Sequence, residues 1–396
     1  MRIKIYNGKV ITENAIIENG CVLIENGKVI NVSCDEIDFD GAIMINAKGK
    51  YISPGFIETH CHGGGGYDFM DETPEDMIKV AELHAKHGTT LIYPTTASCS
   101  DETLFKMFDN YRIANQKNKS GATFGGIHIE GGYLNLHMSG GQDTRYIMNP
   151  EPAHYEKILE KGGDLIARWS IAPELPGVMG LVAELKKRGI QVSMAHTAAL
   201  YDEAVNAYKS GFTSITHFYS LTSSVTRKNA LRYAGVIEAG YMLDSLYVEA
   251  IADGVHLPGP LLQLMFKIKG PEHIVLVTDA MRAAGQNTST SILGSKTGGV
   301  PVIIEDGVAK LPDRSSFAGS IATADRLVRT YIQQGGVNLL DAVRMMTLTP
   351  AQMMKIDYKK GSIAKNKDAD IIIFDDNIHI STTIANGKII YKTPCK

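Results

Sequence analysis

Short runs in which apolar and polar residues alternate stand at both ends of the chain. Asn-Gly pairs separate these runs, and such a pair is typical of a β-hairpin turn because both residues tolerate positive φ. The pattern predicts turns at Asn7-Gly8, Asn26-Gly27 and Asn386-Gly387, and strands at Ile3–Tyr6, Cys21–Ile24, Asp370–Asp375, Thr382–Ile384 and Ile389–Tyr391. We expect residues 1–52 and 356–396 to form one small β domain, with residues 53–355 inserted into it.

The inserted segment alternates longer apolar runs with amphipathic stretches. The clearest helix is Thr73–His87, since Thr73 can cap its N-terminus and Pro74 suits its first turn. Eight apolar runs predict buried strands, namely Phe56–His62, Thr90–Thr95, Phe124–Glu130, Leu165–Ile171, Gln191–His196, Ser214–Phe218, Leu246–Ala252 and Ile274–Asp279.

Eight strand–helix units in about 300 residues favour an α/β fold with a (β/α)8 TIM barrel, beside a small β-sandwich domain from the two chain ends. A doubly wound open sheet is the alternative. Residues Val302–Leu311, around Asp306-Gly307, predict an extra hairpin after the last strand.

Composition narrows the classes of protein that this chain can be. Its 396 residues are 44% hydrophobic and 21% charged, with a net charge of −3, which excludes a disordered chain and gives no general attraction to nucleic acid or anionic lipid. No apolar run approaches the length of a membrane span, and the start lacks a signal-peptide pattern. The five cysteines are scattered and odd in number, so we expect a cytoplasmic protein without a disulfide framework.

Histidines and carboxylates stand at the ends of these predicted strands, where barrel enzymes place catalytic groups. His60 and His62 are two apart on a strand and therefore point to the same side, while Cys61 points away. An isolated pair of this kind is often accidental, but Glu130, His196 and His217 end other strands. Together the five predict a site for one or two divalent ions, with Zn, Fe, Co and Mn all suitable.

Other histidines and carboxylates near the predicted strand ends have more than one possible role. His128 suits a partner behind the ligands or a buried structural histidine better than a ligand. Asp279 follows the eighth strand and suits a proton acceptor beside an activated water, or else a helix cap. His256 suits a donor to a substrate oxygen, or a surface loop. His84 and His87 are expected on the surface of the helix Thr73–His87.

Seven segments resemble the amidohydrolase superfamily, and within it the N-acetylglucosamine-6-phosphate deacetylase family. They are Pro54–Gly63, Gly126–Gly131, Ala195–Ala198, Thr216–Tyr219, Ala252–His256, Val277–Met281 and Ala318–Ser320. The resemblance implies hydrolysis of N-acetyl-D-glucosamine 6-phosphate to glucosamine 6-phosphate and acetate in amino-sugar catabolism. It also implies that Glu130, His196 and His217 hold the principal metal, with His60 and His62 available for a second.

The same resemblance gives roles around the metal. Asp279 matches the general acid/base and His256 the residue at the acetyl oxygen. Arg227 falls close to a phosphate-binding arginine often supplied by the second subunit of a homodimer, with Lys228 and Arg232 as nearby alternatives. Departures from the family lie in substrate loops, and further substrate-binding candidates are Gly131, Gln142, Ser220, Leu221 and Phe317. The alternatives are a deacetylase of another N-acyl amino sugar, such as N-acetylgalactosamine 6-phosphate, and a non-catalytic amidohydrolase-like binding protein.

Overall fold

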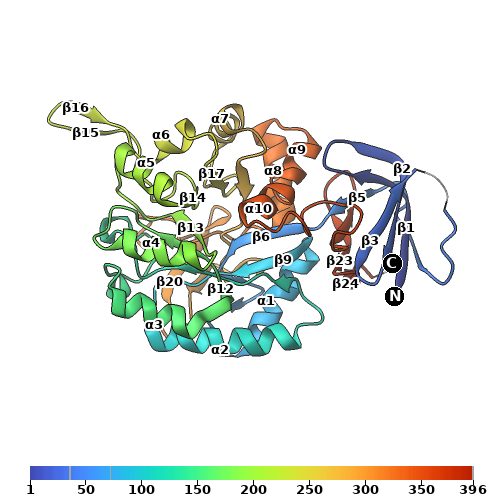
Figure 1. The fold of residues 1–396 in the computed structure, drawn as a ribbon, viewed down its shortest axis with the longest axis horizontal. Coiled ribbons are helices and arrows are strands. Elements are labelled where there is room, and N and C mark those ends of the chain that lie inside the picture. The colour runs from blue at the N-terminus through green and yellow to red at the C-terminus, as the bar shows by residue number, and fades with distance from the viewer. Residues whose placement is uncertain (35–36, 72, 395–396) are drawn as a thin grey trace.

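The computed structural model describes residues 1–34, 37–71 and 73–394. The chain has two parts, which Figure 1 shows next to each other: a small sheet built from both chain ends and a larger α/β part built from the middle. Both termini are found in the small part.

The small part is one eight-stranded sheet in the order β24-β23-β22-β5-β1-β2-β3, with β4 beside β1. Antiparallel pairing of β5 with β22 joins the two ends of the chain, and isoleucine and valine side chains fill its core. The strands are β1 (Arg2–Ile11), β2 (Ile16–Glu25), β3 (Lys28–Ser33), β4 (Ile43–Asn46), β5 (Tyr51–Pro54), β22 (Ile371–Phe374), β23 (Ile380–Ala385) and β24 (Lys388–Lys392).

Two of the three predicted Asn-Gly turns are confirmed. Asn26-Gly27 joins β2 to β3, and Asn386-Gly387 joins β23 to β24. The turn predicted at Asn7-Gly8 is wrong, because β1 runs through it and pairs with β2 on both sides. The positive φ of Asn7, 57°, instead accompanies an irregular register where Gly8 faces Gly20.

The larger part contains parallel strands in two sheets, ordered β10-β9-β6 and β11-β12-β13-β14-β17-β18. Single parallel bridges join the two sheets: Thr95, just after β9, pairs with His128 of β11, and Cys61 of β6 pairs with Ala280, which follows β18. Each of the eight predicted apolar runs contains or overlaps a strand. The strands are β6 (Phe56–Cys61), β9 (Thr89–Pro94), β10 (Thr123–Phe124), β11 (Ile127–Glu130), β12 (Ile166–Ile171), β13 (Gln191–Met194), β14 (Phe212–Ile215), β17 (Tyr247–Ala250) and β18 (Ile274–Leu276).

Helices connect these strands and lie around them in Figure 1. The predicted helix is confirmed as α1, where the Thr73 side chain accepts from the N–H of Asp76 and the Asp76 carboxylate accepts from the N–H of Thr73. None of the helices in the described ranges is long and apolar enough to cross a membrane. The helices are α1 (Pro74–Lys86), α2 (Asp101–Lys117), α3 (Pro152–Gly162), α4 (Val178–Lys187), α5 (Tyr201–Ser210), α6 (Val236–Met242), α7 (Gly259–Lys269), α8 (Ala324–Gly335), α9 (Leu339–Arg344) and α10 (Leu348–Met353).

Three short antiparallel units are added to this framework. The predicted hairpin at Val302–Leu311 is confirmed as β20 (Val300–Glu305) and β21 (Val308–Lys310), to which β19 (Thr290–Leu293) adds a third strand. A second hairpin, β15 (Thr226–Lys228) and β16 (Leu231–Tyr233), extends away from the body in Figure 1. The third, β7 (Gly63–Gly64) and β8 (Tyr67–Asp68), follows β6 directly.

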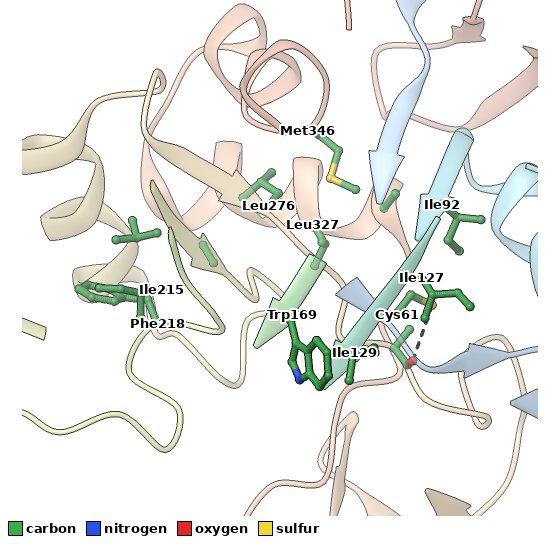
Figure 2. Packing of buried hydrophobic residues seen from close by; sticks show 14 of the residues in the cluster. Cys61, Ile92, Ile127, Ile129, Trp169, Ile215, Phe218, Leu276, Leu327 and Met346 are labelled. Atoms are coloured by element: carbon green, nitrogen blue, oxygen red, sulfur yellow. Dashed lines mark hydrogen bonds between the residues drawn. The ribbon is translucent and has the colours of Figure 1, made fainter. Parts of the chain in front are cut away.

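Apolar side chains of the parallel strands pack into one large core. Figure 2 shows part of it, with Ile92 of β9, Ile127 of β11 and Trp169 of β12. The surface position predicted for His84 is wrong: it is fully buried, and its Nε2 lies 3.0 Å from the carbonyl oxygen of Gly63. The face of α1 that carries His84 is turned toward the segment after β6, so the imidazole meets a backbone acceptor there.

Candidate metal centre and substrate pocket

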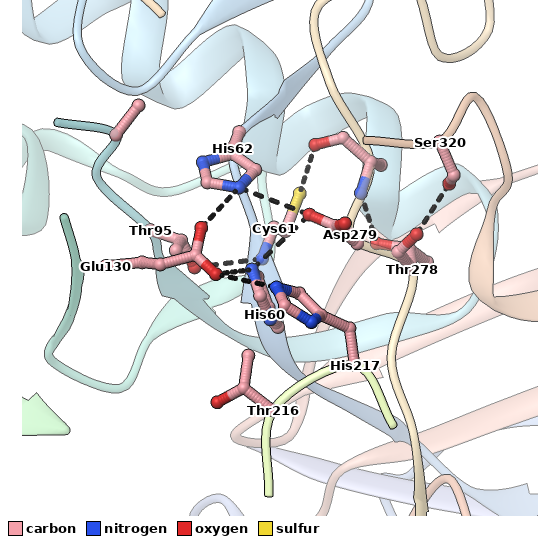
Figure 3. A network of polar contacts seen from close by, with 12 residues as sticks. His60, Cys61, His62, Thr95, Glu130, Thr216, His217, Thr278, Asp279 and Ser320 are labelled. Carbon is pink, nitrogen blue, oxygen red and sulfur yellow. Dashed lines mark hydrogen bonds and ion pairs between the residues drawn. The ribbon is translucent and has the colours of Figure 1, made fainter. Parts of the chain in front are cut away.

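Four histidines and two carboxylates from five strand ends meet at one buried point. Figure 3 labels all of these side chains except His196. His60 and His62 come from the end of β6 and its first following residue, and Cys61 between them is turned to the other side, where its Sγ lies 3.2 Å from His84 Nε2. The predicted same-side placement of His60 and His62 is therefore what the structure shows.

Glu130, the last residue of β11, lies between the histidines. Its Oε1 is 3.1 Å from His217 Nε2 and 3.5 Å from the Nε2 of both His60 and His196. Its Oε2 is 3.2 Å from His62 Nε2. A buried carboxylate that touches four imidazoles is placed to share a cation with them.

Asp279 faces Glu130 from the far side of the histidine pair. Its Oδ1 is 3.1 Å from His62 Nε2 and 3.3 Å from His60 Nε2. Asp279 follows β18 at φ +47°, a conformation that turns its side chain inward. The side chains thus fall into two potential ligand groups, one of His60, His62 and Asp279 and one of Glu130, His196 and His217.

Hydrogen bonds on the far side of three imidazoles orient them toward the centre. The Nδ1 of His196 lies 2.7 Å from the carbonyl oxygen of Met138, and the Nδ1 of His217 lies 3.0 Å from that of Ser220. The Nδ1 of His60 lies 3.2 Å from Glu249 Oε2. Carbonyl and carboxylate oxygens only accept, so each Nδ1 carries the proton and each Nε2 is free to bind a metal ion.

A buried ring nitrogen without a hydrogen-bond partner also indicates that a metal ion binds at this centre. His60 Nε2, which faces the centre, is buried and has no hydrogen-bond partner. Such orphaned groups are rare in native structures and often indicate an ion that completes the site. The nitrogen and carboxylate donors fit a divalent transition metal ion.

The charged groups of the cluster shift one another's pKa values. Burial opposes ionisation of Glu130, but the charge of His60 and hydrogen bonds from His196 and His217 outweigh it and hold the Glu130 pKa well below its usual value. Burial lowers the pKa of His62, but hydrogen bonds to Asp279 and Glu130 raise it to about 9. A metal ion would take the place of these protons, so metal binding is expected to weaken as pH falls.

His128 lies behind the ligands. Its Nε2 is 2.7 Å from Ser170 Oγ, and its ring meets that of His60 edge-on at a centroid distance of 4.8 Å. It belongs to neither ligand group, in agreement with the interpretation of a buried partner behind the ligands.

A cavity of about 520 Å³ opens over the ligand groups. His256 lines it, with Nδ1 held 2.8 Å from Asp253 Oδ2 and the ring 4.4 Å from that of Phe317. Other predicted residues in the lining are Gln142, Ser220, Leu221 and Phe317. Gln142 also contacts a candidate ligand directly, because its Nε2 donates to Glu130 Oε2 at 3.0 Å.

Two predicted substrate residues lie apart from this cavity. Gly131 has φ +130°, and a Cβ there would come within 2.6 Å of the backbone nitrogen of Ser98. Glycine is therefore required by the backbone at that position. Arg227 lies exposed on the β15–β16 hairpin, outside the lining of its own chain's cavity.

The sequence did not point to two cations that do line the cavity. Lys310 ends β21 and Arg314 follows it, and both contact Glu305. Their position just before Ala318-Gly319-Ser320, one of the segments with family resemblance, was the signal that could have identified them.

The strands, the ligand groups and the cavity define a hydrolase-type site at the ends of parallel strands, and comparison with known proteins agrees. Residues 51–390 match the Amidohydrolase family, so the chain belongs to this family.

Among the most similar relatives is N-acetylglucosamine-6-phosphate deacetylase of Lysinibacillus sphaericus, 30% identical over 94% of this chain and 93% of that protein. N-acetylgalactosamine-6-phosphate deacetylase of Escherichia coli O157:H7 is 27% identical over 86% of this chain and 88% of that protein. A solved structure of a mutant N-acetyl-D-glucosamine-6-phosphate deacetylase from Mycobacterium smegmatis, in complex with N-acetyl-D-glucosamine 6-phosphate, is 25% identical. Its TM-score is 0.90, over 99% of this chain and 100% of that one.

Proposed function

We propose that this protein is a metal-dependent hydrolase that removes the acetyl group from N-acetyl-D-glucosamine 6-phosphate, giving glucosamine 6-phosphate and acetate. The observation that carries the proposal is the arrangement of both ligand groups, with Asp279 among them, beneath a cavity of about 520 Å³. Cavities of this size accommodate a small sugar phosphate. The similarity to deacetylases of this substrate over nearly the whole chain supports the choice.

Glu130, His196 and His217 would hold the principal metal ion, and His60 and His62 a second. When bound, a divalent transition metal ion supplies Lewis-acid activation of water and of the amide carbonyl. Zinc is one suitable identity, beside iron, cobalt and manganese.

Asp279 would transfer the proton, and His256 would contact the acetyl oxygen of the substrate. Asp279 accepts the proton of the attacking water and returns it to the amide nitrogen as the C–N bond breaks. His256 Nδ1 donates to Asp253 Oδ2, so the doubly protonated imidazolium is the form whose Nε2–H can be donated to the acetyl oxygen.

Phosphate recognition would come from a second copy of the chain. The exposed hairpin that carries Arg227 extends from the body, which suits insertion into a neighbouring cavity of a homodimer. Guanidinium matches phosphate oxygens in a bidentate manner. Lys310 and Arg314 offer additional cations within the chain, though both are partly neutralised by Glu305.

The finer architecture is part of the same proposal. The single bridges between the two parallel sheets support one closed (β/α)8 barrel over residues 53–355. Residues 1–52 and 356–396 would form a β-sandwich-like domain, and the enzyme would act on its substrate in the cytoplasm.

A second candidate substrate is the galacto epimer, N-acetylgalactosamine 6-phosphate. The similarity to a deacetylase of that sugar favours it, and Ser220 and Leu221, where the sequence departs from the resembled family, line the cavity and leave the sugar epimer open. Neither epimer changes the proposed chemistry at the amide.

A substrate panel tests both candidates. The metal-loaded protein is assayed for acetate release from N-acetylglucosamine 6-phosphate, its galacto epimer and both unphosphorylated sugars. We expect the highest kcat/KM for the phosphorylated gluco sugar. A preference for the galacto epimer would select the second candidate, and no release from any N-acyl sugar would leave the binding-protein alternative.

A further inference from the structure

A layer of buried polar side chains lies directly beneath the two ligand groups. Its central pair is Arg168 of β12 and Glu249 of β17, both fully buried. Arg168 Nη1 and Glu249 Oε1 form a close ion pair. Two buried charges in a barrel interior are costly to desolvate, so their presence calls for a role in the site above them.

Glu249 contacts one member of each ligand group through a single oxygen. Its Oε2 accepts from His60 Nδ1 at 3.2 Å and from the backbone N–H of His217 at 3.1 Å. His60 belongs to the group with Asp279, and His217 belongs to the group with Glu130. One carboxylate oxygen therefore fixes the relative position of both groups.

Arg168 holds that carboxylate in place. While Nη1 binds Glu249 Oε1, Nη2 donates to Ser193 Oγ at 3.0 Å and Thr216 Oγ1 at 3.1 Å. These contacts fix the guanidinium plane, and with it the direction in which Glu249 Oε2 points. The ion pair also keeps Glu249 an acceptor only, which requires the proton of His60 to reside on Nδ1 and exposes the Nε2 lone pair to the centre.

We propose that Glu249 and Arg168 are positioning residues that set the tautomer of His60 and the spacing between the two ligand groups. The inference rests on the proposed metal-dependent function. A merely structural ion pair would stabilise the barrel without influencing how tightly a metal ion binds. A positioning pair changes metal affinity and the geometry around the ion.

The test is a Co²⁺ titration of the full chain after chelator treatment, followed by the visible absorption of the bound ion. In Glu249→Gln the amide cannot accept from both Arg168 and His60, since one of its two ends is a donor. We expect an apparent Co²⁺ affinity lower by about 10- to 100-fold, as for other partners of metal-bound histidines, and an altered absorption spectrum. Ser214→Ala is the matched control, because Ser214 is a buried polar residue of β14 whose hydroxyl has no hydrogen-bond partner, so the change breaks no contact of Arg168, Glu249 or a candidate ligand, and it should change affinity by less than about threefold.

A second variant separates the loss of positioning from the effect of leaving one buried charge unpaired. Arg168→Met with Glu249→Met removes both charges together, which a folded core tolerates better than the loss of one. We expect this double variant to keep the weak Co²⁺ binding of Glu249→Gln.

Three outcomes would overturn the inference: wild-type Co²⁺ affinity in Glu249→Gln, recovery of wild-type affinity in the double variant, or an equal loss in Ser214→Ala. Because the readout is metal binding, it is independent of the sugar substrate. A wild-type protein that binds Co²⁺ but releases no acetate would contradict the proposed function alone.

Discussion

Three candidate ligands occupy a backbone conformation that few residues with a side chain adopt. The φ angles are +45° at His196, +30° at His217 and +47° at Asp279, and each residue lies just beyond its strand. Such positions cost of order 1–3 kcal/mol each and persist where the surroundings fix them, often at functional sites. Here the conformation turns three side chains from separate strand ends toward one point.

The first prediction concerns the principal metal position. Changing His196 or His217 to Ala removes one nitrogen from the group that contains Glu130. Metal content of the purified protein, measured by elemental mass spectrometry, should fall together with kcat. His137→Ala, at an exposed position, is the control and should change neither. Full metal occupancy in both ligand variants would show that these two histidines do not hold the ion.

The second prediction concerns the proton. Asp279→Asn keeps the size of the side chain, but an amide cannot accept the proton of water and return it to the leaving nitrogen. The kcat for acetate release should fall at least about 10²-fold, the usual range for a general acid or base. Metal held by Glu130, His196 and His217 should be retained, which elemental analysis of the same sample checks. A variant with near-normal kcat would place the proton transfer on another group.

At the scale of elements, packing against the rest of the chain accounts least for the β15–β16 hairpin. All six of its strand residues are exposed, among them the apolar Leu231 and the cations Arg227 and Arg232. An exposed pair of strands with an apolar side chain and a cluster of cations suits contact with a second molecule.

The third prediction tests that element. Arg227→Ala should weaken binding of the phosphorylated sugar by about 1.5–3 kcal/mol, the range for hydrogen bonds to charged groups, and should affect the unphosphorylated sugar much less. Lys228→Ala, the neighbouring cation on the same strand, is the matched control with a smaller expected effect. Inhibition constants of substrate analogues with and without phosphate provide the measurement. Equal losses for both analogues would assign Arg227 a structural role.

The sequence was most informative where a clear hydrophobic pattern and residues able to bind a metal occur together. Continuous apolar runs located every strand at the site, because strands buried on both faces leave that pattern. Strand ends were placed two or three residues late at His196, His217 and Asp279, since positive φ at a histidine or aspartate leaves no signal in the sequence. The β15–β16 hairpin was not predicted, because its exposed residues bury no face and so show no clear alternation.

At the scale of the whole molecule, burial shifts two groups behind the site in opposite directions. Burial raises the pKa of Glu58 to about 8, although N–H groups of His60 and Thr278 donate to its carboxylate and oppose the shift. Burial lowers the pKa of His84 to about 4, against the opposing contact with the carbonyl oxygen of Gly63. Each group is therefore held neutral inside the fold near neutral pH.

These two shifts act on stability with opposite signs. The unfolded chain protonates His84 below about pH 6.5, whereas the folded chain resists until about pH 4, so this group lowers the free energy of unfolding as pH falls. For Glu58 the folded chain binds the extra proton between about pH 4.3 and pH 8, so its contribution is lost as pH rises. Because the two contributions oppose each other, the free energy of unfolding of the wild-type protein would change little with pH between about pH 4.3 and pH 6.5.

The fourth prediction isolates the contribution of His84 by comparing the wild-type protein with a variant that lacks this histidine. His84→Gln cannot titrate, but its amide can still donate to the carbonyl oxygen of Gly63. Urea unfolding of both proteins with chelator present, at pH 7.5 and pH 5, gives the free energy of unfolding at each pH. Between these values the wild type should lose about 2 kcal/mol relative to the variant, because the unfolded His84 gains a proton that the folded one refuses. Glu58 contributes equally to both proteins and cancels in the difference. Parallel pH profiles would mean that His84 is protonated inside the fold, and that the segment after β6 tolerates a buried charge beside Cys61.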